Sequence, residues 1–451
     1  MKNVLVAASL LAPLAANGAT LEERVEELEF ARDLNVIQWS GELNTRADSV
    51  TKKTETASGS NEVSFNLYRM KFSLNMDATL SNRLAFHGRI TQGKVFNELL
   101  GQSGVADGST LNSLNDLHGY SGNQLYVEKA YFDFNITDNL IFTVGRLPTA
   151  EGGPYHLTIG KPNRSTYPRL AYAYSLDGVA LSYNLGDLSF KALYHPFSTS
   201  DRDGNYFKER TLASGLTPKP SDAHLWVGMV DYSKMGTFLA KKIEANLHYV
   251  SLESLYLLTQ PNTPTTENGI TSTTYSDLYL HSKRASAYLE LNGFLKTPLT
   301  LAIAHSAGVS KGFISKTNGV ATDANGNVVA TIDLERTNPK TQYAAGTLIT
   351  AKYDIKVGAK QHSVGAQYMM NNRFFSLTDL AGREPFNLWS VAGNAMHVFY
   401  NYPLDNGLVW NTGYIAKDPK YNTTSGADLS TDQGDTITKS SSAYMELILG
   451  F

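Results

Sequence analysis

Apolar and polar residues alternate along the chain from Val36 to its last residue, which is the pattern of β-strands that have two different faces. The final strand shows it most clearly, in residues 440–451. One of its faces carries only apolar residues: Ala443, Met445, Leu447, Leu449 and Phe451. The other face carries Tyr444, Glu446 and Gly450, with Ile448 as an apolar exception. An apolar strand at the end of the chain suits the closing strand of a barrel in a bilayer.

The connections between the predicted strands alternate strictly between short and long. We predict about sixteen strands, near residues 36–47, 63–79, 82–93, 124–136, 138–146, 175–184, 187–196, 224–234, 243–253, 283–294, 298–309, 343–356, 360–370, 392–403, 406–416 and 439–451. The even connections are short, as in 80–81 and 185–186, whereas the odd ones are long: 48–62, 94–123, 147–174, 197–223, 254–282, 310–342, 371–391 and 417–438. Short periplasmic turns and long external loops are typical of a transmembrane antiparallel β-barrel. The predicted fold class is therefore all-β, with both termini in the periplasm.

Strand parity predicts which charges face the lumen. A charge on the lipid face costs about 2–4 kcal/mol near the bilayer midplane, so the charged face of each strand must point inward. The inward parity of three neighbouring strands carries a basic stripe: Arg69, Lys71, Arg83, Arg89 and Lys129. Acids share the inward parity: Glu42, Asp77, Asp133, Glu244, Glu290, Asp354 and Glu446. The interior of such a barrel is too wide for side chains to fill, so we predict an aqueous channel. The charges then either form a transverse field that filters solutes or pair off in a lattice of salt bridges.

Residues 1–19 and 20–35 differ from the rest of the chain. Residues 1–19 have a short positive start, an apolar stretch and a small-x-small cleavage motif, which predicts a signal peptide. Residues 20–35 contain apolar positions at 4-3 spacing among glutamates, which predicts an amphipathic helix. That helix either forms a short coiled coil beneath a homotrimer or rests on the barrel rim. Residues 36–451 form the barrel.

The composition agrees with this class. Only 42% of the residues are hydrophobic, yet 25 are Tyr, 19 are Phe and 36 are Gly, as expected where alternate residues face lipid and aromatic residues form interfacial girdles. The absence of Cys excludes disulfides and thiolate metal sites. A net charge of −3 gives no indication of nucleic-acid binding.

Three features of the chain resemble known outer-membrane barrels. The terminal Phe451 resembles the C-terminal signature that the barrel-assembly machinery of Gram-negative bacteria reads. Val144-Gly145-Arg146 followed by Glu151-Gly152-Gly153 resembles the general porins, in which the loop after the fifth of sixteen strands folds into the lumen as a constriction. The segments 128–135 and 144–148 also resemble an uncharacterised group of proteobacterial porin-like barrels with a short N-terminal helix. The resemblance implies an outer-membrane porin with a constriction formed by residues 147–174.

The predicted constriction departs from the porin pattern in its charge. General porins usually carry an acidic cluster on this loop, whereas this chain has Glu151 against a larger basic set. The predicted lumen and constriction residues are Arg69, Lys71, Arg83, Arg89, Lys129, Asp133, Arg146, Glu151, Lys161, Arg164 and Arg169. This balance favours anions over cations. The alternative is an ordinary external loop whose basic residues contact lipopolysaccharide phosphates.

The remaining motifs do not indicate an enzyme. Gly308-Val309-Ser310-Lys311-Gly312 matches a nucleophile-elbow string but lacks the strand-to-helix turn that the elbow requires. Two Asp-rich loops resemble the start of calcium loops without their essential Gly and Glu positions. The histidines show no metal-ligand spacing, and we predict neither a metal nor a cofactor.

The predicted function is passive diffusion of small hydrophilic solutes or ions across the outer membrane of a Gram-negative bacterium. The expected partners are these solutes, outer-membrane lipid, lipopolysaccharide and the assembly machinery. The alternative is a surface structural or adhesion protein that a barrel anchors.

Overall fold

The computed structural model describes most of the predicted barrel and none of the N-terminal segment. The described residues are 37–56, 59–95, 125–149, 152–163, 165, 170, 176–197, 223–261, 265–267, 270–325, 327–337, 341–372, 375, 391–405, 407–420 and 436–451. The predicted signal peptide (1–19) and amphipathic helix (20–35) lie outside this set. No helix within the described residues is long and apolar enough to cross a membrane.

The strands follow the predicted order along the chain. Their bounds are β1 Ile37–Thr56, β2 Gly59–Ser81, β3 Leu84–Val95, β4 Leu125–Asn135, β5 Leu140–Leu147, β6 Leu176–Leu185, β7 Leu188–Phe197, β8 Ala223–Met235, β9 Ala240–Pro261, β10 Thr265–Glu267, β11 Ile270–Phe294, β12 Leu299–Thr322, β13 Val328–Thr337, β14 Thr341–Val357, β15 Lys360–Asn371, β16 Gly393–Asp405, β17 Leu408–Pro419 and β18 Thr436–Gly450. One short helix, α4 (Tyr155–Ile159), lies between β5 and β6.

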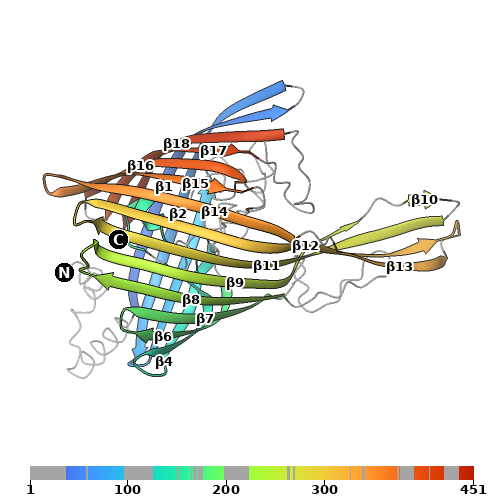
Figure 1. The fold of residues 1–451 in the computed structure, drawn as a ribbon, viewed down its shortest axis with the longest axis horizontal. Coiled ribbons are helices and arrows are strands. Elements are labelled where there is room, and N and C mark those ends of the chain that lie inside the picture. Colours follow the sequence, from blue (N-terminus) through green and yellow to red (C-terminus); the bar gives the residue numbers. More distant parts are fainter. Residues whose placement is uncertain are drawn as a thin grey trace, which may run out of the picture.

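The strands form a closed antiparallel barrel (Figure 1). Neighbours in sequence pair around the ring, except that β9 pairs with β11 past β10 and β12 pairs with β14 past β13. β1 closes the ring by pairing with both β2 and β18. Sixteen strands make up the ring, because β10 and β13 belong to external hairpins. The predicted fold class and strand number are therefore confirmed.

The outer surface of the barrel is apolar and its inner surface is largely polar. On β18, Met445, Leu447 and Leu449 are exposed, whereas Glu446, between them, is buried. Exposed apolar side chains also alternate along β15 and β16: Val364, Tyr368, Met370, Met396 and Val398. An exposed apolar band around a closed barrel is stable only in lipid, so the predicted outer-membrane location fits the structure.

Phe451 lies where the ring closes. Its backbone N–H donates to the carbonyl of Gly41, and its carbonyl accepts from the N–H of Gly41. Its ring stacks on Phe72 with centroids 6.4 Å apart. The last residue thus holds β18 to β1 at the end of the barrel where the short turns lie.

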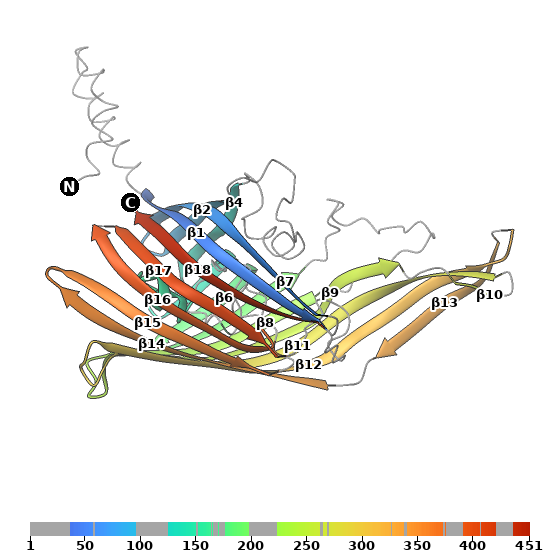
Figure 2. The same cartoon turned by 90° about the horizontal axis from the view of Figure 1, so that it is seen from above.

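Strands extend far beyond the ring at the other end (Figure 2). The predicted loops 48–62, 254–282 and 310–342 are largely strand, which corrects the sequence-based boundaries. The ends of β9, β11 and β12, together with β10 and β13, form an external β-arm. These segments are rich in Thr and Tyr, which favour strands, but without a lipid face they lose the apolar alternation on which the prediction relied. Within the arm, β12 and β13 pair as an antiparallel hairpin.

Candidate functional site: the helix inside the barrel

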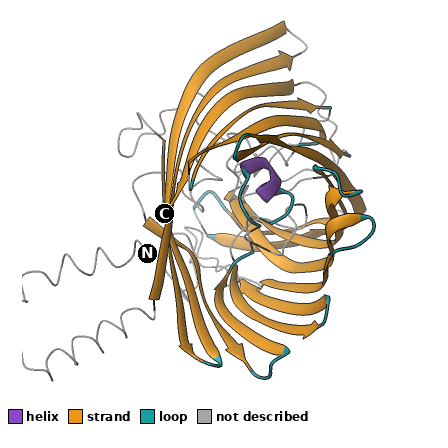
Figure 3. Cartoon of the chain, turned by 90° about the vertical axis from the view of Figure 1, so that its left-hand side faces the viewer, coloured by secondary structure: helices purple, strands orange, loops and turns teal. Residues whose placement is uncertain are grey.

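Helix α4 lies inside the barrel (Figure 3). It belongs to the predicted constriction loop 147–174, whose described part therefore enters the lumen. Tyr155 and Ile159 of α4 pack against Ile448 of β18 and Val409 of β17. Ile448 is the apolar exception on the polar face of the last strand. Its side chain is buried because it supports this helix.

Polar side chains of the wall also hold the loop. Asn411 of β17 donates to the carbonyl of Thr158 over 3.2 Å, and Asn401 of β16 donates to the carbonyl of Leu157 over 3.5 Å. The Nζ of Lys161 donates to the carbonyl of Gly407 over 3.2 Å. The carbonyls of Leu157 and Thr158 have no further turn of helix to bond, so Asn401 and Asn411 of the wall complete the hydrogen bonding of this short helix.

A polar cavity of about 370 Å³ lies between the loop and the wall of β9–β17. The loop contributes His156, Leu157, Gly160, Lys161, Pro162 and Asn163. The charged residues of its wall come from three strands: Lys242, Glu244, Glu290, Lys352 and Asp354. Glu244, Glu290 and Asp354 therefore face the interior, as their parity predicts.

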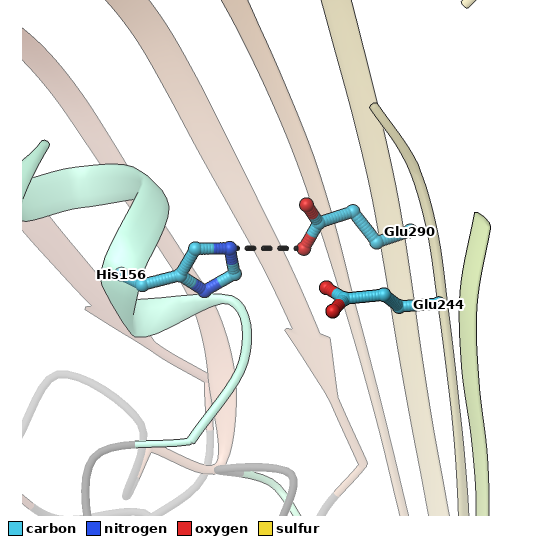
Figure 4. Close-up of side chains that lie close together, drawn as sticks. All are labelled: His156, Glu244 and Glu290. Atoms are coloured by element: carbon cyan, nitrogen blue, oxygen red, sulfur yellow. Dashed lines mark ion pairs between the residues drawn. The ribbon is translucent and has the colours of Figure 1, made fainter. Parts of the chain in front are cut away.

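One cluster in this cavity joins the loop to the wall (Figure 4). The Nε2 of His156 lies 3.1 Å from Oε2 of Glu290. Glu244 lies beside them, and one ligand atom from each of the three residues falls within 4.8 Å of the others. The hydroxyl of Tyr288 donates to the carboxylate of Glu290 over 2.5 Å, and Lys242 pairs with Glu244.

Three residues of the predicted basic stripe, Arg69, Lys71 and Arg89, are buried and paired with acids. Arg69 and Arg46 each lie 2.8 Å from the carboxylate of Asp48. Lys71 and Arg89 lie 3.4 and 3.5 Å from the carboxylate of Glu128. The structure thus favours the salt-bridged lattice for these positions. The sequence reasoning did not identify Arg46 or Asp48 as site residues, although both have the inward parity of β1.

Glu128 faces inward because of a β-bulge. Arg89 pairs with Lys129 and Ile90 pairs with Val127, so Glu128 is an extra residue between two paired positions. Its carboxylate accepts a hydrogen bond from Thr91 over 2.6 Å. Strict alternation had placed Glu128 on the lipid face, and a bulge is the local structure that alternation does not reveal.

The other predicted site residues lie at separate places. Lys129 is half-buried on the inner face beside Arg89. Asp133 accepts from Thr143 over 2.5 Å and lies 3.6 Å from His87. Arg146 pairs with Asp177 at the outer end of β5, over 3.1 Å.

Arg83 is not on the wall. It lies in the turn between β2 and β3 and is exposed, because β3 begins only at Leu84. Glu151, Arg164 and Arg169 lie outside the described residues.

The inner wall also carries apolar clusters that parity did not predict. One cluster covers β5–β9: Leu147, Leu176, Ala180, Leu193, Leu225, Val227, Met229, Val250 and Leu252. Another surrounds Leu157 and Leu170 of the loop and includes Tyr288, Leu348, Met369, Phe375 and Ile415. The interior is therefore only partly an aqueous, polar surface.

Comparisons with known proteins agree with the barrel fold. A family described as "Protein of unknown function (DUF3373)" matches residues 61–195. The comparison with curated proteins found no match. Among solved structures, the chain is similar to OprB of Pseudomonas putida, solved at high pH, with 12% identity, a TM-score of 0.50, and coverage of 93% of this chain and 96% of that chain.

Two further similarities are weaker. In the in-vitro folded outer membrane protein OmpT of Vibrio cholerae, the match has 12% identity, a TM-score of 0.45, and coverage of 92% and 97%. In OmpF of Salmonella typhi, in complex with daunomycin, it has 12% identity, a TM-score of 0.41, and coverage of 91% and 97%. At 12% identity, the similarity to OprB shows a shared fold alone.

Proposed function

We propose that the chain is an outer-membrane channel for passive diffusion of small hydrophilic solutes or ions, with its constriction at the loop 147–174. The observation that carries the proposal is the polar cavity between α4 and the wall of a closed barrel. A loop that enters the lumen and leaves a polar passage beside it limits permeation by size, and its charges act on the solute where the passage is narrow.

The anchoring of the loop supports a constriction of constant size. Ile448, Asn401, Asn411 and the backbone of Gly407 hold residues 155–161 from three adjacent strands and a turn. A loop that only contacted lipopolysaccharide would need neither these inward contacts nor an apolar support on the polar face of β18.

Ion selectivity depends on more than the basic stripe. The cations Arg46, Arg69, Lys71 and Arg89 outnumber Asp48 and Glu128, with which they pair. Glu42, Asp77 and Asp133 add negative charge to the same wall, so the excess of positive charge is local to these pairs. We propose a weak preference for anions, to which Lys129, Arg146 and Lys161 contribute and which Asp133 and the acids around α4 oppose.

Planar-bilayer conductance of the purified protein tests the channel directly. We expect discrete steps of uniform size that grow with salt concentration. Replacing Ile448 by Asn, which removes the apolar support of α4, should broaden the distribution of step sizes. Bilayers that stay silent with folded, heat-modifiable protein would contradict the channel.

The external β-arm favours a second function. An extended sheet of β9–β13 with free ends beyond the ring suits a surface structural or adhesion role. Shortening β11 and β12 together, by the paired segments 271–279 and 314–322, tests this role. A change in cell-surface binding with unchanged conductance would assign the arm a function of its own.

Export and assembly complete the proposal. We propose that residues 1–19 are removed as a signal peptide, that residues 20–35 form a periplasmic helix, and that the protein assembles as a homotrimer. The barrel-assembly machinery would recognise Phe451, and outer-membrane lipid and lipopolysaccharide would surround the apolar band. Native electrophoresis of a folded variant that lacks residues 20–35 distinguishes between a coiled coil and a free helix.

A further inference from the structure

We propose that His156, Glu244 and Glu290 bind one divalent transition-metal ion, for which Zn²⁺ is the probe, and that this ion joins α4 to the barrel wall. The three residues come from the loop, from β9 and from β11. The proposal concerns ion binding by the folded protein, and it can be tested whether or not the channel conducts.

The geometry suits a three-residue metal site. Zinc bonds of about 2.0–2.2 Å in tetrahedral geometry place ligand atoms about 3.4 Å apart. The 3.1 Å between His156 Nε2 and Glu290 Oε2 is close to that value, and all three ligand atoms fall within 4.8 Å of one another. A small rotation of Glu244 therefore closes the set without movement of the backbone.

The register of the barrel places two acids directly opposite each other. Glu290 pairs with Glu244 across β11 and β9, and both side chains point inward. Like charges at directly opposed positions destabilise a sheet. Lys242 pairs with Glu244, whereas no Lys or Arg among the described residues forms an ion pair with Glu290, so a cation bound between the two carboxylates would relieve their repulsion.

The ligand chemistry selects the type of metal. Ca²⁺ and Mg²⁺ prefer oxygen ligands alone, whereas an imidazole nitrogen with two carboxylates suits Zn²⁺ and its first-row neighbours. Three protein ligands leave a fourth position, which the adjoining cavity can fill with water. Tyr288 supports the site from behind by donating to Glu290, as second-shell groups do for metal-bound carboxylates.

A bound ion would act on the constriction. Among the polar contacts that hold residues 155–161, those of Asn401 and Asn411 bind α4 to β16 and β17, whereas His156 reaches Glu290 of β11; Ile448 of β18 adds an apolar contact. A metal bond at His156 would therefore fix α4 to β11 as well as to β16–β18.

The test is Zn²⁺ titration of tag-free protein, refolded in detergent and freed of metal with a chelator. We expect one ion per chain by isothermal calorimetry. His156→Ala and Glu244→Gln should each weaken Zn²⁺ binding by about 100-fold. Loss of a residue that only supports a metal ligand typically costs about 10–100-fold in affinity, and loss of a ligand itself should cost at least as much. Glu244 is partly exposed, so Glu244→Gln is expected to fold even if His156→Ala does not.

The matched control is His87→Asn. His87 also lies between two acids, but its Nδ1 faces Asp77 at 2.7 Å and its Nε2 faces Asp133 at 3.6 Å, so the two carboxylates approach opposite ring nitrogens and cannot share one ion with it. This variant should bind Zn²⁺ as the parent does. Lys242→Gln removes the cation that competes at Glu244 and should tighten binding several-fold.

Anomalous scattering at the zinc edge gives an independent measurement. A peak beside His156 Nε2, Glu244 and Glu290 supports the proposal. Absence of binding in the parent, equal loss in His87→Asn, or unchanged affinity in both His156→Ala and Glu244→Gln overturns it. Weaker binding in Lys242→Gln would also contradict it, because it would show that the ammonium organises the carboxylates rather than competing for them.

Discussion

The inner walls of β1–β4 and of β9–β11 neutralise their acidic side chains in different ways. In the first wall, a single buried acid lies between two cations, and this arrangement occurs twice, at Asp48 and at Glu128. In the second wall, Glu244 and Glu290 face each other across the strands, and one histidine from the loop approaches them. The first wall has its counter-ions within the sheet, whereas the second depends on Lys242 and on the loop.

This difference shows that inward parity alone does not define the electrostatics of a lumen. Both walls follow the same alternation, and both were predicted to carry inward charges. Whether those charges repel or attract is decided by which residues the register places side by side. The same carboxylate-to-amide change should therefore destabilise the first wall and have little effect on the stability of the second.

The largest effect is expected for Asp48→Asn. Its side chain is fully buried and accepts from Arg46, Arg69 and Ser442, so the change leaves two buried guanidinium groups without their counter-ion. We expect a loss of about 3–5 kcal/mol in the free energy of unfolding. Urea unfolding in lipid vesicles, followed by tryptophan fluorescence, measures it.

Asp177→Asn is the control for Asp48→Asn. It removes an acid whose side chain is 71% exposed and which pairs with Arg146. Exposed ion pairs contribute about 0–1 kcal/mol, so this variant should unfold close to the parent. If both variants unfold at the same urea concentration, the first wall does not depend on its buried acid.

A smaller effect is expected for Glu128→Gln. The amide can still accept from Thr91, but Lys71 and Arg89 lose a charged partner, which costs about 1.5–3 kcal/mol. The wall also becomes more positive, so the reversal potential should shift toward anion selectivity. The shift should be largest near 0.01 M salt, where the Debye length is about 30 Å.

Glu62→Gln is the control, because it removes a negative charge that does not lie on the lumen wall. Glu62 is exposed at the outer end of β2 and has the opposite parity to Arg69 and Lys71. It should leave the reversal potential almost unchanged. An equal shift in both variants would mean that the total charge of the protein, not the wall, sets selectivity.

Asn411→Ala tests the loop that approaches the second wall, because Asn411 of β17 helps to hold this loop in place. The change removes the hydrogen bonds to the carbonyl of Thr158 and to Glu446, and we expect a cost of about 1 kcal/mol. Because α4 is then held less firmly, single-channel recordings should show more open-state noise. Asn75→Ala, which removes a hydrogen bond between β2 and β1, should not change the noise.

The smallest effect is expected for Glu244→Gln in the presence of a chelator. Relief of repulsion from Glu290 offsets the lost pair with Lys242, so stability should stay within about 0.5 kcal/mol of the parent or rise slightly. The urea assay used for Asp48→Asn also measures the free energy of unfolding of this variant, so the effects on the two walls can be compared directly. A loss of several kcal/mol here would remove the contrast between the walls.

Much of the fold could be predicted from the sequence because lipid imposes a local rule. Each spanning strand must alternate, since one face meets hydrocarbon and the other meets the lumen, and each short turn leaves a gap in that pattern. The closed ring of sixteen strands follows from this rule, as do the inward parities of Arg69, Lys71, Arg89 and Glu290. Where the lipid face ends, as in the β-arm, the rule ends too, and there the predicted boundaries were wrong.

By itself, the sequence determined the barrel, its strand order and the side of the wall that most residues face, because these depend on neighbours along one strand. Only the tertiary structure decided that Glu128 turns inward at a bulge, that Ile448 supports a helix, and that His156 meets Glu244 and Glu290. Those three outcomes depend on residues that are far apart in the chain. Their meeting is set by cross-strand register and by the path of a loop, and neither leaves a periodic signal in the sequence.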